Sequence, residues 1–237
     1  MNAGKASYTN GRTTISSFLY KPQGNGPFPA VLVLHTRGGL NQRHEPPFGQ
    51  YLSTQGYVAL VPDYFTPEGI TPAAFEQNWS TKADAVREDL ARGLDCLKSL
   101  PYVAPGRLGS VGFSLGGYWN VMLATRDDVK GVVNWYGAYA GRPVNPFVTQ
   151  YAFSDMVAAV KAPILMLHGD GDTEVPLQLA QRAKGLLDAA GKASDLVVYP
   201  GIGHGWDLQG IPSYVYDDKT TQDAKARTLA FFGDKLK

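Results

Sequence analysis

One serine lies among three glycines in the stretch VGFSLGGYW, residues 111–119. Gly112, Ser114 and Gly116 form the pattern G-x-S-x-G, in which a serine hydroxyl can act as a nucleophile. The pattern alone is weak, because a chain with 27 glycines easily contains it by chance. Here an apolar strand pattern precedes it and a helical pattern follows, and this setting holds a strained serine at a helix start. We therefore predict that Ser114 is a nucleophile; a glycine-rich turn with a capping serine is the alternative.

A base and an acid follow Ser114 along the chain. His204 lies in YPGIGHGWD, on a loop after a strand pattern, where its imidazole can be directed toward the serine. Asp172 lies in LHGDGDTEVP, after another strand pattern, and can orient that imidazole and stabilise its cation. Asp170 and Glu174 are neighbours that could take the place of Asp172. The order Ser, Asp, His is that of the α/β-hydrolases.

Acyl transfer also needs backbone N–H groups that bind the developing oxyanion. Leu115 directly follows the serine and supplies one of them. The second is expected from the loop TRGGL, where Arg37 is the first choice and Thr36 the alternative. Gly38 and Gly39 keep the backbone of this loop close and unobstructed.

Several further side chains near strand ends or in long loops could line a substrate pocket. We predict this role for the aromatic residues Trp79, Tyr136 and Trp206 and for Thr36, with core packing as the alternative for the aromatic rings. The neighbours His44 and Glu45 have no metal-ligand spacing to the other histidines, so we interpret them as a surface pair and expect no metal site.

Elements that could position these residues alternate along the chain. From about residue 28, short β-rich runs alternate with longer helical patterns, which indicates an α/β fold with a mostly parallel sheet covered by helices on both faces. The helix over 81–100 has an apolar stripe and begins at Ser80 or Thr81 as its N-cap. The predicted strands are 13–20, 29–35, 57–63, 107–113, 131–137, 162–169 and 194–200, and the other predicted helices are 47–55, 115–126, 176–190 and 221–235.

Composition limits the class of protein. No linker or charge run divides the chain, so we expect one domain over residues 1–237, and the roughly 25 residues between 137 and 162 leave no room for a large lid. A formal charge of +1, from 22 basic and 21 acidic residues, gives no basic surface for nucleic acid or a membrane. Cys96 is the only cysteine, which favours a cytoplasmic protein, and we expect a monomer or small homo-oligomer.

Six segments, in order and at similar spacing, resemble the dienelactone hydrolase family of α/β-hydrolases: PAVLVLHTRGGLN, QGYVALVPDYF, GFSLGGYW, HGDGDTEVP, YPGIGHGW and DAKARTLAFF. The resemblance covers nearly the whole chain. It implies a hydrolase of small esters or lactones that needs no cofactor or metal and forms a covalent acyl-enzyme. At the matching positions, Ser114, Asp172 and His204 would form the triad, and Arg37 and Leu115 would supply the oxyanion N–H groups.

The chain also departs from the founding members of that family. Those enzymes use a cysteine nucleophile held by a glutamate, whereas this chain has Ser114 and, at the place of the glutamate, Thr36. They hold the substrate carboxylate with an arginine four residues after the catalytic histidine, and this chain has Leu208 there. A neutral ester or lactone is therefore favoured over dienelactone.

These patterns together predict a serine hydrolase of small carboxylic esters or lactones, that is, a carboxylesterase or lactonase. Dienelactone hydrolysis proper, acyl transfer and peptide hydrolysis on the same triad are alternatives. The missing lid argues against large peptide substrates. A binding protein without catalytic activity is an alternative of another class, and the complete set of triad residues argues against it.

Overall fold

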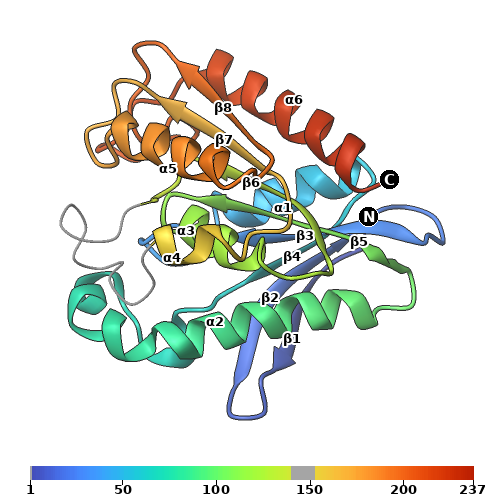
Figure 1. Cartoon of the computed structure of the whole chain (residues 1–237). Coiled ribbons are helices and arrows are strands. Elements are labelled where there is room, and N and C mark those ends of the chain that lie inside the picture. Colours follow the sequence, from blue (N-terminus) through green and yellow to red (C-terminus); the bar gives the residue numbers. More distant parts are fainter. Residues whose placement is uncertain (1, 140–152) are drawn as a thin grey trace.

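An eight-stranded sheet forms the centre of the computed structural model (Figure 1). The structure describes residues 2–139 and 153–237, without the side chains of residues 2, 3 and 74–80. The strand order is β1-β2-β4-β3-β5-β6-β7-β8; β2 is antiparallel to both neighbours, and all other pairs are parallel. The strands are β1 (Asn2–Thr9), β2 (Thr14–Lys21), β3 (Phe28–Leu34), β4 (Val58–Pro62), β5 (Val103–Phe113), β6 (Val129–Trp135), β7 (Ile164–Gly169) and β8 (Ser194–Tyr199).

Helices cover both faces of this sheet (Figure 1). Side chains of β3 alternate between the faces: Leu32 and Leu34 pack in the core beneath α2 to α5, and Val31 and Val33 pack in the core beneath α1 and α6. Burial on both faces explains why the central strands are almost continuously apolar. The helices are α1 (Glu45–Thr54), α2 (Phe75–Ser99), α3 (Leu115–Leu123), α4 (Phe153–Val157), α5 (Leu177–Ala189) and α6 (Asp218–Lys235), with short 3₁₀ turns at Thr66–Glu68 and Pro72–Ala74.

The α/β class and the mostly parallel sheet predicted from the sequence are confirmed. The prediction missed β1, whose side chains are mostly exposed and show no apolar alternation. The predicted start of α2 was wrong: the helix begins at Phe75, so neither Ser80 nor Thr81 is its N-cap. No proline or glycine lies between 75 and 80, so nothing in the chain stops an earlier start. None of the described helices is long and apolar enough to cross a bilayer.

No inserted domain is seen in the described part of the connection between β6 and β7. Its described helix is α4, and residues 140–152 lie outside the described part of the chain. In a parallel sheet the loops after the strands gather at one edge, which is where ligands bind in such folds. The loops after β5, β7 and β8 carry Ser114, Asp172 and His204, and the loop after β3 carries Thr36 and Arg37.

The turn from β5 into α3 is the most constrained of these connections. Ser114 has φ 51° and ψ −111°, a backbone conformation that side-chain-bearing residues rarely adopt. A β-carbon on Gly112 would collide with the carbonyl of Gly116, and one on Gly116 would lie 2.5 Å from the carbonyl oxygen of Leu34. A β-carbon on Gly117 would lie 2.6 Å from Cα of Gly137. The glycines are therefore required by the close approach of backbone to backbone on both sides of the serine.

We expect Gly117→Ala to lower the free energy of unfolding by about 1–3 kcal/mol, because its new methyl group meets backbone that cannot rotate away. Gly185 in α5 is the matched control, since a β-carbon there meets nothing within 4 Å. Gly185→Ala should raise the free energy of unfolding by about 0.5–1 kcal/mol. Urea unfolding of both variants measures the two effects. A Gly117→Ala protein as stable as the parent would contradict the packing described here.

Candidate active site

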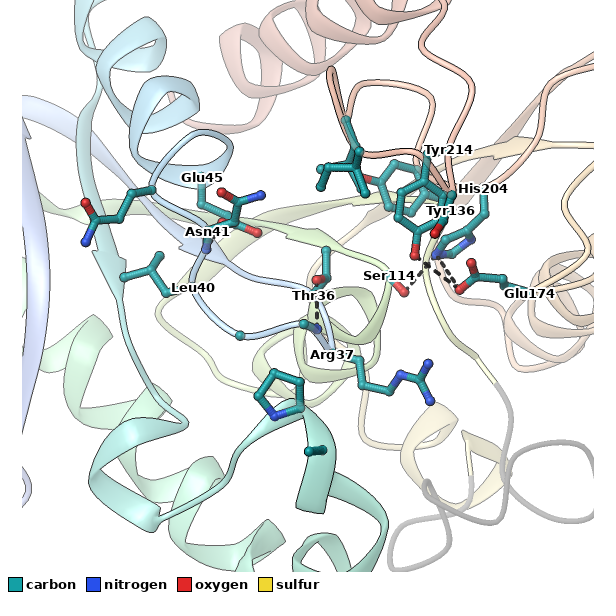
Figure 2. A pocket seen from close by; sticks show the side chains of 18 residues that line it. Thr36, Arg37, Leu40, Asn41, Glu45, Ser114, Tyr136, Glu174, His204 and Tyr214 are labelled. Carbon is teal, nitrogen blue, oxygen red and sulfur yellow. Dashed lines mark hydrogen bonds and ion pairs between the residues drawn. The ribbon is translucent and has the colours of Figure 1, made fainter.

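A cavity of about 640 Å³ opens at the carboxyl ends of the strands (Figure 2). Ser114 and His204 lie on its wall, and Glu174 stands beside them. Tyr136 and Tyr214 lie next to His204 in the view, and the loop from Thr36 forms the opposite wall.

The structure brings the three residues of the predicted triad together. His204 Nε2 lies 3.0 Å from Ser114 Oγ, and His204 Nδ1 lies 2.7 Å from Asp172 Oδ2. Asp172 and His204 are buried, and the serine and histidine come from positions 90 residues apart. With the Nδ1 proton on the side of Asp172, the Nε2 lone pair faces the serine hydroxyl. In this tautomer the hydroxyl donates to the imidazole, so that the proton can be transferred.

The carboxylate of Asp172 is fixed by its own loop. Its Oδ1 accepts hydrogen bonds from the backbone N–H groups of Glu174 at 3.0 Å and Val175 at 2.8 Å. Asp170 accepts instead from the N–H of Gly201 at 2.6 Å. The Glu174 carboxylate reaches the other nitrogen of the histidine, with Oε2 at 3.9 Å from Nε2. Of the three acids considered from the sequence, Asp172 is therefore the one placed to orient Nδ1.

The two predicted oxyanion donors flank the cavity. Leu115 is the first residue of α3, where the helix dipole favours negative charge, and Arg37 lies on the loop after β3. Neither of their N–H groups donates a hydrogen bond to another residue of the described chain. The neighbouring loop is shaped by Thr36, whose Oγ1 accepts from the N–H of Gly38 at 3.0 Å. Within the described part of the chain, both N–H groups are therefore left without a protein acceptor.

The four side chains predicted to line the pocket differ in their placement. Thr36 and Tyr136 lie on the wall. The prediction for Trp206 was wrong: its side chain is fully buried, and its ring packs edge-on against Tyr136 at 4.7 Å and near Trp135 at 6.2 Å. This side chain points from the loop into the core, so it supports the wall from behind. The side chain of Trp79 lies outside the described residues.

The sequence interpretation of His44 and Glu45 as a surface pair was also wrong. Both side chains are buried, and His44 lies between two carboxylates, with Nε2 at 2.7 Å from Asp207 Oδ2 and Nδ1 at 2.9 Å from Glu45 Oε1. Glu45 also lies on the cavity wall. No local signal could reveal the pair of His44 and Asp207, because 163 positions separate them.

The charges in this cluster can be assigned from its geometry. Burial alone lowers the pKa of His44, but the carboxylates of Asp207 and Glu45 outweigh this effect and raise the pKa to about 10. Burial acts to raise the pKa of Asp207, but the charge and hydrogen bond of His44 and the hydroxyl of Tyr136 keep it below its ordinary value. His44 is therefore a cation at neutral pH. Among the described residues, no group of three or more His, Cys, Asp or Glu side chains has the arrangement of a metal site.

The mostly parallel sheet, with a strained serine between strand and helix, has the form of an α/β-hydrolase fold. The chain belongs to the dienelactone hydrolase family, whose model matches residues 15–236. A protein of Methylorubrum extorquens that carries the name of a proposed carboxymethylenebutenolidase is 32% identical over 213 residues, which are 84% of this chain and 70% of the relative.

Solved structures agree with this fold. A structure described as a proposed dienelactone hydrolase from Klebsiella pneumoniae has a TM-score of 0.87 at 25% identity and covers 98% of both chains. Acylaminoacyl peptidase from Pyrococcus horikoshii has a TM-score of 0.81 at 17% identity, over all of this chain but 42% of the peptidase, and this likeness concerns the fold alone. The protein is thus a hydrolase-family member with an open pocket at the expected edge of its sheet.

The ion pair of His44 predicts how stability depends on pH. The folded protein holds the His44 proton with a pKa of about 10, whereas the ordinary value is 6.5. The resulting stabilisation is therefore fully present below about pH 6.5 and is lost as the pH rises to about 10. We expect the melting temperature of the parent to fall more between pH 7 and pH 10 than that of the double variant His44→Gln/Asp207→Asn.

Both residues are replaced because removal of one leaves the other as an unpaired buried charge, and glutamine is chosen at position 44 because its amide can still donate to the buried Glu45. The double variant keeps every other titrating group, so lysines and tyrosines contribute to the pH dependence of both proteins and cancel in the comparison. Equal losses of melting temperature in the two proteins would show that His44 does not hold its proton as described.

Proposed function

We propose that this protein is a serine hydrolase that cleaves small carboxylic esters or lactones through an acyl-enzyme on Ser114. The observation that supports it most directly is the contact series Ser114 Oγ, His204 and Asp172, at 3.0 Å and 2.7 Å, on the wall of an open cavity. Three loops after three different strands contribute these groups. Membership of a hydrolase family supports the same chemistry independently.

The proposed reaction follows from this geometry. His204 Nε2 takes the proton from Ser114 Oγ as the oxygen attacks the substrate carbonyl carbon, and the N–H groups of Leu115 and Arg37 bind the oxyanion. His204 then gives the proton to the leaving alcohol oxygen, or to the ring oxygen of a lactone, and the acyl-enzyme remains. Water then attacks the acyl carbon while His204 takes its proton; the bond between this carbon and Ser114 Oγ breaks, His204 returns the proton to Ser114 Oγ, and the carboxylic acid leaves. Asp172 holds the imidazole in one orientation throughout.

The charges on the cavity wall favour a neutral substrate. Arg37 is the only lysine or arginine among its described residues, whereas Glu45 and Glu174 contribute carboxylates. Leu208 lies on the wall at the place where the founding enzymes have an arginine for the substrate carboxylate. Thr36 lies where those enzymes have a glutamate that holds a thiol, a role that a serine nucleophile does not need. The name of the Methylorubrum relative refers to a butenolide, an unsaturated lactone, which supports lactones as one substrate class.

Other parts of the proposal rest on the sequence. A single domain over residues 1–237, a cytoplasmic location and a monomer or small homo-oligomer all remain predictions. Acyl transfer to an alcohol is the alternative on the same triad, because the open cavity admits an alcohol as easily as water. A lack of turnover despite an intact triad would identify a binding protein instead.

Replacement of the nucleophile or the base tests the chemistry. We expect Ser114→Ala and His204→Ala each to lower kcat for p-nitrophenyl esters by about 10³-fold or more, and the double variant to be little worse than either. Ser110→Ala is the matched control, since this buried serine lies on β5, the strand that leads into Ser114, and its hydroxyl has no hydrogen-bond partner in the described structure. It should keep the parent kcat. Mass spectrometry after a fluorophosphonate should place the adduct on Ser114; full activity of Ser114→Ala would end the proposal.

Substrate charge gives a separate test. We expect cis-dienelactone, a carboxylate, to have a kcat/KM at least roughly tenfold below that of a neutral short-chain lactone, because the wall offers no arginine at position 208. Leu208→Arg should bring the two kcat/KM values closer together, and Leu208→Met should leave their ratio unchanged. Fast turnover of cis-dienelactone by the parent would contradict the neutral substrate class but not the serine mechanism.

A further inference from the structure

Tyr136 has a conformation that needs an explanation. It directly follows β6 with φ 41°, and among the described non-glycine residues only Ser114 shares a positive φ. A residue held in this region costs roughly 1–3 kcal/mol and persists only where its surroundings fix it. The backbone N–H of Tyr136 donates to the carbonyl of Leu167 at 2.8 Å, and its hydroxyl donates to Asp207 Oδ1 at 2.6 Å. Both ends of the residue are therefore held.

The consequence of this conformation is the position of the ring. The Tyr136 ring lies against His204 at 4.7 Å between centroids and 64° between planes, on the wall of the cavity (Figure 2). Trp206 packs edge-on against the same ring at 4.7 Å. The imidazole is thus supported by Tyr136, which in turn is supported from the core.

The hydrogen bond of Tyr136 continues into a chain of buried contacts. Asp207 Oδ2 lies 2.7 Å from His44 Nε2, and His44 Nδ1 lies 2.9 Å from Glu45 Oε1. The other oxygen of Glu45 accepts from the N–H of Asn41 at 2.8 Å. We call Glu45, His44, Asp207 and Tyr136 the buried polar chain.

This buried polar chain joins three loops that meet at the site. Asn41 and Glu45 belong to the segment after β3 that also carries Arg37, Tyr136 follows β6, and Asp207 lies three residues after His204. A buried ion pair is weak support for stability, because apolar residues of similar size often stabilise a protein as well or better. The hydrogen bonds of such a pair do, however, fix the orientation of the side chains that form them, which apolar contacts leave free. The feature that needs a fixed direction here is the imidazole of His204.

We propose that Tyr136 is a positioning residue for His204 and that the buried polar chain holds its ring in place. The inference rests on the proposed hydrolase function. The ring keeps the imidazole directed at Ser114 in both the acylation and the deacylation step, and Asp207 fixes the ring through the tyrosine hydroxyl. Misplacement of a reacting group by a fraction of an ångström lowers the rate with little change in substrate binding.

The test compares two tyrosine hydroxyls. Tyr136→Phe keeps the ring and removes its hydrogen bond to Asp207. Tyr199→Phe is the matched control: its hydroxyl also donates to an aspartate, Asp223 at 2.9 Å, and its ring also packs against Trp206, at 5.5 Å, but it contacts neither His204 nor the cavity. Tyr136→Phe should lose more melting temperature than Tyr199→Phe, because Asp207 is buried whereas Asp223 is partly exposed and can bond to water.

For Tyr136→Phe we expect kcat for p-nitrophenyl esters to fall about tenfold with KM within twofold, and the rate of phosphonylation of Ser114 by a fluorophosphonate to fall by the same factor. Tyr199→Phe should keep both rates. The double variant His44→Gln/Asp207→Asn, which removes the ion pair without leaving one partner of it charged, should also lower kcat, and adding Tyr136→Phe to it should lower kcat no further, since the ring is held through the same contacts.

The outcomes separate this inference from the proposed function. If Ser114 of the parent reacts with the fluorophosphonate and Tyr136→Phe reacts at the same rate, the positioning role is wrong and the hydrolase proposal stands. An equal loss of kcat in Tyr199→Phe, or a change in KM alone, overturns the positioning role as well. If Ser114 of the parent is not modified, the proposed function fails and this inference fails with it.

Discussion

The imidazole of His204 makes two hydrogen bonds in different directions, and the geometry of the site depends on both. Nδ1 faces Asp172 and Nε2 faces Ser114, at 2.7 Å and 3.0 Å. A rotation of the ring by a few tens of degrees would break both contacts at once, because each needs a well-aligned donor and acceptor. The three side chains lie on three loops, and none of these loops fixes the position of another by local sequence. The sheet beneath them, with its strands buried on both faces, supplies the rigid frame.

Each member of the triad is held by a different physical means. Ser114 is held in a strained conformation by its surroundings: its N–H donates to the carbonyl of Trp135 at 3.0 Å, and Gly112, Gly116 and Gly117 allow strand, turn and helix to touch. Asp172 is fixed by two backbone N–H groups that occupy the oxygen not used by the histidine. The loop of His204 is held on both sides of the histidine, by the N–H of Gly201, which donates to Asp170 Oδ1 at 2.6 Å, and by the carbonyl of Trp206, which accepts from the N–H of Asp217 at 2.8 Å. The imidazole itself packs against the rings of Tyr136 and Tyr214, at 4.7 Å and 5.9 Å between centroids.

A feature of the fold or the site could be predicted from the sequence where the interactions that determine it are local in the chain. The serine and the loop of His204 directly follow apolar strand patterns, and the glycines around Ser114 reflect steric limits within one turn. The edge strand β1 has no apolar face and so leaves no periodic signal. The orientation of Trp206, into the core rather than toward the cavity, depends on the turn after His204 and cannot be seen in residue type. His44 and Asp207 are joined only by the fold, across 163 positions, and a histidine beside a glutamate is far more often a surface pair.

The same buried polar chain bears on the proposed preference for a neutral substrate. His44 is one cation between the carboxylates of Asp207 and Glu45, so the cluster carries an excess of negative charge, and Glu45 brings it to the cavity wall. Glu174 adds a second carboxylate close to His204. Charges buried beneath a pocket are screened less by salt than exposed ones, so their field reaches a bound ligand. Under the proposed function, the residues inferred to position His204 would therefore also disfavour an anionic acyl group, and the leucine at position 208 adds no cation that would offset this repulsion. The proposed orientation of the histidine and the proposed preference for a neutral ester or lactone would then have one structural source.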